Sequence, residues 1–179
     1  LYSSAASDVY KRQDYDELQA SVASFAASCA NKLRGQHSLT SAVTVFASSN
    51  CFREDLPQYS NGQTRILLLP TSDTIEITQA ALSVLKEIYQ EGISYKKTGV
   101  ILGDITDASY IQQNLFDEVK NRPERMQLMK SIDALNHRFG LRKIHLAVEG
   151  EEKQAWHAKS EFRSGNYLSD LKEILTIQI

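Results

Sequence analysis

Several features that mark common protein classes are scarce or missing in this sequence. It has two cysteines, Cys29 and Cys51, which argues against a disulfide framework and favours free thiols in a cytoplasmic protein. No segment approaches the roughly 20 consecutive apolar residues of a membrane-spanning helix. Residues 3–13 also lack the apolar centre of a secretory signal. The sequence therefore predicts a cytoplasmic protein without a membrane partner.

Residues that commonly catalyse reactions or bind metals are also sparse. The four histidines are His37, His137, His145 and His157. None of them has a second histidine or cysteine at the spacing of a metal site. A P-loop, a nucleophile elbow and a glycine-rich dinucleotide turn are all missing. We therefore predict no catalytic residue, no metal ligand and no bound cofactor in this chain.

The composition is that of a folded protein of ordinary size. Apolar residues make up 42% of the 179 residues and charged residues 23%, with a net charge of -2. This length suits one domain with an appendage. The total charge by itself indicates neither a nucleic-acid partner nor a membrane partner.

Hydrophobic periodicity predicts an α+β protein. Apolar residues recur every three or four positions from Leu18 to Leu33, as in a helix with one buried face. The predicted elements are a helix at Tyr15–Arg34, strands at Leu39–Ala47 and Thr64–Pro70, a helix at Thr74–Glu91 and a strand at Tyr95–Ile105. Each helix is preceded by an acidic D-x-x-E capping box, and the second box consists of Asp73 and Glu76.

This order resembles a β-α-β-β-α-β domain, with two helices on one face of its sheet, that has lost its first strand. We therefore expect Leu1–Gln13 to be loose, or at best to extend the first helix, with the strand position left empty.

A second, smaller unit is predicted beyond a polar linker at Thr106–Pro123. Residues Glu124–Arg138 have the apolar stripe of a helix, and "KIHLAVEG" at residues 143–150 is expected to form a short strand. These elements predict a small α/β tail domain at residues 124–179.

The basic residues Arg53, Arg65, Lys96 and Lys97 lie in strand-side segments that contain no Asp or Glu. Most acidic residues fall on the predicted helices instead. Helices on one face of the sheet would then leave a basic open face that suits DNA phosphates. The alternative is that strands disfavour Asp and Glu whatever their function.

The linker contains a short motif, "QQNLF", which comprises Gln112, Gln113, Asn114, Leu115 and Phe116. An exposed Leu-Phe pair in a polar segment is explained if it fills an apolar pocket on a partner while the glutamine makes polar contacts. The alternative is that both apolar side chains fold back onto their own domain.

Several blocks, in the correct order, resemble the C-terminal part of UmuC-type Y-family DNA polymerases, the catalytic subunits of bacterial DNA polymerase V. The blocks are "YDELQASVASFAASCANKLR", "TVFASSNCF", "YKKTGVILGDI", "QQNLFD", "LMKSIDALNHRFG" and "WHAKSEFRSGNY". The resemblance implies that residues 14–105 are the little finger, which holds template-primer DNA by its backbone. It implies that the "QQNLF" motif within residues 106–123 is similar to the pentapeptide that binds the β sliding clamp. It also implies a UmuD-type regulatory subunit as a partner, and residues 124–179 as the tail domain of these proteins.

The same resemblance also limits the activity that we expect of this chain. In this family acidic residues of a palm domain hold two magnesium ions for nucleotidyl transfer, and no block of this sequence corresponds to a palm. The resemblance therefore implies the DNA-binding and clamp-docking portion of an error-prone translesion polymerase of the SOS response and DNA repair, inactive alone. The alternative from another class is a free-standing α+β binding or adaptor module.

The stretch "SSAASDVYKRQ" at residues 3–13 resembles the translation of a transposase sequencing adapter. We therefore predict that residues 1–13 are adapter-derived and that the native sequence begins near Asp14.

Overall fold

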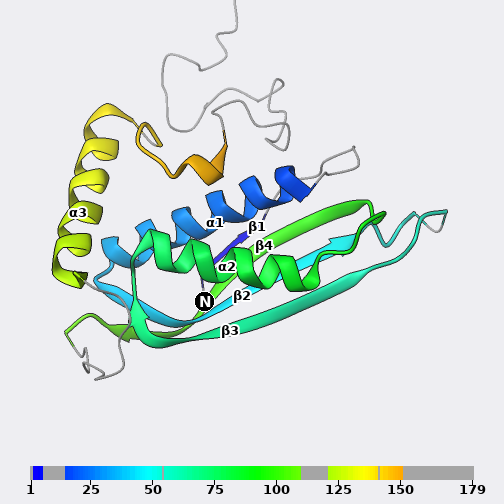
Figure 1. Cartoon of the computed structure of the whole chain (residues 1–179), viewed down its shortest axis with the longest axis horizontal. Helices are drawn as coiled ribbons and strands as arrows, with labels where there is room; N and C mark the ends of the chain where they lie inside the picture. Colours follow the sequence, from blue (N-terminus) through cyan, green and yellow to red (C-terminus); the bar gives the residue numbers. More distant parts are fainter. Residues whose placement is uncertain (1, 6–14, 54, 110–120, 141, 151–179) are drawn as a thin grey trace, which may run out of the picture.

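The structure, a computed structural model, is centred on a four-stranded antiparallel sheet with helices on one face (Figure 1). It describes residues 2–5, 15–53, 55–109, 121–140 and 142–150. The strands are β1 (Tyr2–Ala5), β2 (Ser38–Ser49), β3 (Ser60–Thr71) and β4 (Tyr95–Asp107), in the sheet order β1-β4-β2-β3. The helices are α1 (Tyr15–Gly35), α2 (Thr74–Ile88) and α3 (Arg122–Phe139), and Ala147–Glu149 forms the 3-10 helix η1. This arrangement confirms the predicted α+β class.

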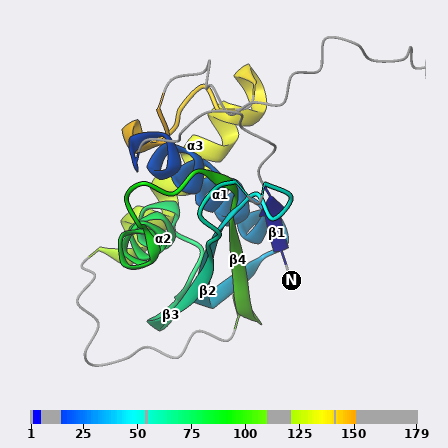
Figure 2. The same cartoon turned by 90° about the vertical axis from the view of Figure 1, so that its right-hand side faces the viewer.

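The core lies between the sheet and the helices α1 and α2, which Figure 2 shows on the same side of the sheet. Val43 and Val45 of β2 are fully buried there, and their partners across the strand pair are Leu102 and Val100 of β4. Successive strand residues point to opposite faces. The residues between them therefore point away from the two helices.

The elements differ from the predicted ones mainly at their ends. The strand predicted to begin at Thr64 already begins at Ser60, which shortens the loop between β2 and β3. Helix α2 ends at Ile88 rather than Glu91 because the next residue, Tyr89, has an extended backbone. The Tyr89 N–H still donates to the Leu85 carbonyl at 2.9 Å and closes the last turn.

The expectation of an empty first-strand position is wrong. Tyr2–Ala5 forms β1 and pairs with β4, and Ser3 lies opposite Ile101. An unpaired strand edge presents backbone N–H and C=O groups that any extended segment can bind, so this pairing does not require apolar side chains. The strand is 4 residues long and lies at the edge of the sheet. The foreign origin of residues 3–13 stays a prediction.

The expected strand at residues 143–150 is also wrong, because side chains rather than a neighbouring strand bind this backbone. Asn136 donates from Nδ2 to the Ile144 carbonyl and accepts the Ile144 N–H at Oδ1, both at 2.8 Å. The Glu149 carboxylate accepts the N–H of Leu146 at 2.9 Å. These bonds satisfy the backbone and stabilise a turn followed by η1.

Some predicted features lie outside the described residues, namely the motif Gln112–Phe116 and the tail from residue 151. Both cysteines are described and free; Cys29 is buried and Cys51 is exposed. Within the described ranges, no helix is both long and apolar enough to cross a membrane.

Candidate nucleic-acid interface

The face of the sheet that points away from α1 and α2, here called the open face, is built by β4, β2 and β3. Three rows across these strands define it: Lys97–Ser48–Ser60, Gly99–Phe46–Gly62 and Ile101–Thr44–Thr64. Residues directly opposite in antiparallel strands have neighbouring side chains on one face. None of these residues is acidic. The rows therefore present no carboxylate that would repel a phosphate.

The middle row of the open face consists of one aromatic residue, Phe46, with a glycine on each side. Phe46 lies between two glycines, and a Cβ added at Gly62 would lie 3.2 Å from the Phe46 Cβ. The glycine therefore leaves room for the aromatic side chain. Further along β3, Ile66 and Leu68 are 69% and 76% exposed. The open face thus combines exposed apolar groups with the hydroxyl groups of the flanking rows.

The amide of Gln58 binds several described residues of the loop between β2 and β3. Its Nε2 lies within hydrogen-bonding distance of the carbonyl oxygens of Asn50 (3.2 Å), Arg53 (2.7 Å) and Leu56 (3.2 Å). The Asn50 side chain accepts the N–H of Phe52 at 3.1 Å. This turn leaves the Phe52 side chain 85% exposed.

A hollow of about 430 Å³ lies between this loop and the start of β4, and we call it the loop hollow. Its lining residues are Ser48, Ser49, Asn50, Cys51, Phe52, Gln58, Tyr59, Ser60, Lys96 and Lys97. A β-bulge brings both lysines there, because Ser48 pairs with Lys97 whereas Ser49 pairs with Tyr95. The described lining contains two positive charges and no carboxylate.

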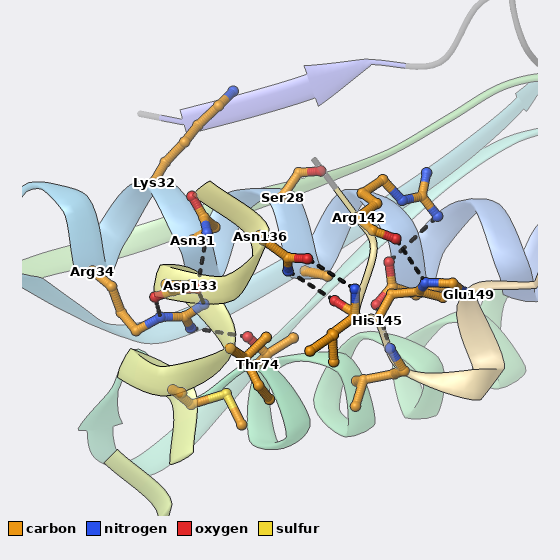
Figure 3. Close-up of a pocket in the computed structure, with 15 residues that line it drawn as sticks. Ser28, Asn31, Lys32, Arg34, Thr74, Asp133, Asn136, Arg142, His145 and Glu149 are labelled. Atoms are coloured by element: carbon orange, nitrogen blue, oxygen red, sulfur yellow. Dashed lines mark hydrogen bonds and ion pairs between the residues drawn. The ribbon is translucent and has the colours of Figure 1, made fainter. Parts of the chain in front are cut away.

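A second cavity, of about 310 Å³, lies between α1, α3 and the segment after α3 (Figure 3). Asp133 accepts hydrogen bonds from Arg34 Nε at 2.6 Å and Nη2 at 2.8 Å, and Arg34 Nη1 donates to the Thr74 hydroxyl at 2.9 Å. Glu149 is 3% exposed and lies 3.4 Å from Arg142. Burial raises the pKa of Glu149, while a backbone hydrogen bond and the Arg142 charge oppose the shift. These polar groups bind one another and attach α3 to the sheet domain.

Comparison with known families shows which family the chain belongs to. Residues 3–115 match the family described as the impB/mucB/samB family C-terminal domain. The chain belongs to this family. Residues 126–177 match a second family, described as a domain of unknown function, DUF4113. The resemblance to UmuC-type proteins that the sequence blocks indicated is thereby confirmed.

Three curated relatives of this impB/mucB/samB-family chain from Salmonella typhimurium illustrate the similarity. Protein UmuC is 34% identical over 92% of the chain and 39% of its own length. Protein ImpB is 35% identical over 90% of the chain, and Protein SamB is 36% identical over 89% of it. The chain thus spans 37–39% of the length of these relatives.

The fold brings three of the four predicted DNA-binding residues to one end of the sheet. Lys96 and Lys97 line the loop hollow, and Arg53 follows Phe52 on the adjoining loop. The Arg53 guanidinium forms an exposed ion pair with Asp55 at 2.6 Å. The two lysines thus share the loop hollow, and Arg53, on the loop beside it, is paired with a carboxylate.

Arg65 lies on the other side of the sheet, so its expected position on the open face is wrong. It is opposite Val43, a core residue, and its guanidinium pairs with Glu87 of α2. Strand residues alternate between faces, and the scarcity of acidic residues in a strand does not determine the face on which each cation lies.

Sequence reasoning missed Phe52 and Gln58. A single aromatic residue in a loop belongs to no period, and its one signal is that it interrupts the polar stretch "SSNCFRED". The dipeptide Asn61-Gly62, a combination that commonly marks a turn, lies within β3. The described residues also bring together no group of three His, Cys, Asp or Glu side chains that could hold a metal ion.

Proposed function

We propose that this chain is the duplex-DNA-binding and clamp-docking portion of an error-prone translesion DNA polymerase that acts in the SOS response and DNA repair. Membership of the impB/mucB/samB family supports the general role. The observation that carries the DNA-binding role is the open face, which has no carboxylate in its three rows and has two lysines at one end.

In this proposal the open face and the loop hollow contact the DNA backbone. Lysines release condensed counterions when they neutralise phosphates, and this term is independent of sequence. Hydroxyl groups such as those of Ser48 and Ser60 add hydrogen bonds to phosphate oxygens. Arg53 lies beside them, whereas Arg65 is directed to α2 and is not part of this surface.

The test is duplex binding by a variant that combines Lys96→Ala with Lys97→Ala. Each phosphate contact contributes a slope of about 0.9 to the dependence of log affinity on log salt, so the double variant is expected to lose nearly 2 from this slope. The loss should be equal on duplexes of unrelated sequence.

The matched control combines Lys32→Ala with Lys86→Ala. These exposed lysines lie on α1 and α2, so the control removes the same charge from the helix side of the sheet. If both double variants weaken binding equally, the effect is one of total charge and the proposed surface is rejected.

Clamp docking is proposed for the motif Gln112–Phe116, which lies outside the described residues. Leu115→Ala combined with Phe116→Ala should abolish capture by a bacterial β sliding clamp, because truncated apolar anchors commonly cost about 2 kcal/mol or more each. Met126→Ala with Leu128→Ala is the control, since these side chains of α3 are 44% and 49% exposed. Clamp capture by the motif variant would reject the assignment.

A UmuD-type regulatory subunit remains a further proposed partner, which the family resemblance alone supports.

Residues 1–13 are proposed to be foreign to the native protein. A chain in which a native upstream strand replaces them should unfold at a higher denaturant concentration. Equal midpoints would reject the foreign origin.

A further inference from the structure

We propose that the loop hollow binds one unpaired nucleotide of the DNA, with the base against the Phe52 ring and the phosphate at Lys96 and Lys97. This inference rests on the proposed DNA-binding function. It goes beyond that function because backbone binding to a duplex does not require an aromatic ring.

The loop between β2 and β3 exposes the Phe52 side chain to solvent. An aromatic side chain that is 85% exposed gains little for the folded state from its apolar surface. The backbone that carries it is nevertheless held, by the Asn50 side chain on the Phe52 N–H and by the Gln58 amide, which lies within hydrogen-bonding distance of three carbonyl oxygens. The ring therefore projects from ordered backbone, so less chain entropy is lost when a ligand binds.

The loop hollow has the size and the lining groups that suit a nucleotide. Its volume of about 430 Å³ is within the range of roughly 300–1,000 Å³ that small-ligand sites occupy. Two ammonium groups suit a phosphate, and the neighbouring hydroxyl and amide groups of Ser60 and Asn50 suit a sugar or a base edge. An aromatic ring beside such a charged, polar surface is the combination with which proteins bind single-stranded nucleic acid.

An unpaired nucleotide fits better than a paired one for a geometric reason. In a duplex both faces of each base are covered by neighbouring base pairs, and the grooves expose only base edges. A Phe ring has no hydrogen-bonding group with which to read an edge. It can contribute its full apolar face when a base is unstacked, as in a single-stranded extension of the template.

The test compares two DNA substrates with the full chain: a blunt duplex and the same duplex with a single-stranded extension. The wild type should bind the extended substrate more tightly. Phe52→Ala should remove this preference, a loss of at least about fivefold in the affinity for the extended substrate relative to the blunt duplex. Phe52→Trp should retain the preference because it keeps an aromatic face. A fluorescent adenine analogue in the extension should be quenched by the wild type and not by Phe52→Ala.

Phe139→Ala is the matched control, because Phe139 is also a largely exposed aromatic residue, at 60%, but lies on α3. Blunt-duplex binding with no preference for the extension, or a preference that Phe52→Ala retains, would overturn the inference and leave the proposed function intact. If the wild type binds neither substrate, both are rejected. If it binds only the extension, with Phe52 required, the inference stands and duplex binding is rejected.

Discussion

The attachment of α3 to α1 depends on one carboxylate, and its removal is the sharpest structural test that the fold offers. Asp133 accepts hydrogen bonds from Arg34 at 2.6 and 2.8 Å and from Asn31 Nδ2 at 2.9 Å. Figure 3 shows the three side chains converging between the two helices. Among the described residues of α3, Met129 alone is buried, so apolar packing contributes little there. Asp133→Ala should therefore loosen the helix, although Arg122 and Arg125 still bind Glu76 and Asp73 of the sheet domain.

The size of the effect follows from the burial of the pair. Exposed ion pairs contribute about 0–1 kcal/mol, whereas hydrogen bonds to charged groups contribute about 1.5–3 kcal/mol each when they are shielded. The side chains of Arg34 and Asp133 are 11% and 26% exposed, which places them between these limits. The remaining arginine keeps its bonds to the Ser72 carbonyl and the Thr74 hydroxyl. We expect a loss of about 2 kcal/mol, or about 30-fold in the equilibrium for opening of α3.

Hydrogen exchange measures this opening directly, because local opening exposes the amides of α3 without unfolding the sheet. Exchange in α3 should accelerate about 30-fold in Asp133→Ala, and exchange in β2 and β4 should not change. The control is Asp55→Ala, which removes an ion pair whose side chains are 51% and 61% exposed. If the two variants affect α3 equally, the ion pair does not hold the helix and the reasoning is refuted.

Three further predictions concern single residues. The raised folded-state pKa of Glu149 means that the folded protein binds this proton more tightly, so its contribution to stability is present below the ordinary pKa and lost as pH rises through the raised one. The denaturation midpoint should therefore fall as pH rises through this range, and Glu149→Gln should make the fall smaller. If the variant shows the same dependence of the midpoint on pH as the wild type, the burial of Glu149 does not cause it. Cys51, which is exposed, should react with an alkylating reagent in the native protein, whereas Cys29 should react on unfolding; bound DNA should slow the first reaction. Gly62→Ala should lower stability by about 1 kcal/mol through its contact with Phe46, and calorimetry would show whether the midpoint falls.

The buried faces of the helices could be predicted because periodicity records burial along one element. Helix α2 illustrates this. Its helical period places Ile77, Ala81, Val84, Leu85 and Ile88 on one face, and each of them is at most 1% exposed. One amphipathic period determines which side of a helix meets the core, whatever the rest of the chain does.

The candidate interface was predicted only in part because its geometry depends on pairing between elements. The scarcity of acids in the strands was visible, but the face of each cation depends on register and on the bulge beside Lys96. Arg65 shows the consequence, since its position opposite Val43 directs it to α2. A shift of one residue would reverse this assignment, and no local pattern determines that shift.

Asp73 and Glu76 show how contacts with α3 change a local signal. The sequence predicted a reciprocal capping box at the start of α2. Asp73 does cap the helix, but its second oxygen accepts from Arg125 at 2.7 Å. Glu76 accepts from Arg122 at 3.2 Å instead of returning to the Asp73 N–H, which donates to the Thr71 hydroxyl. These arginines are 52 and 46 residues away in the chain, so local reasoning could not find them. The carboxylates that begin α2 therefore also attach α3, whose residues from Met126 on lie within the DUF4113 match, to the sheet domain. Because this attachment is largely ionic, added salt should weaken it more than it weakens the apolar contacts of the core.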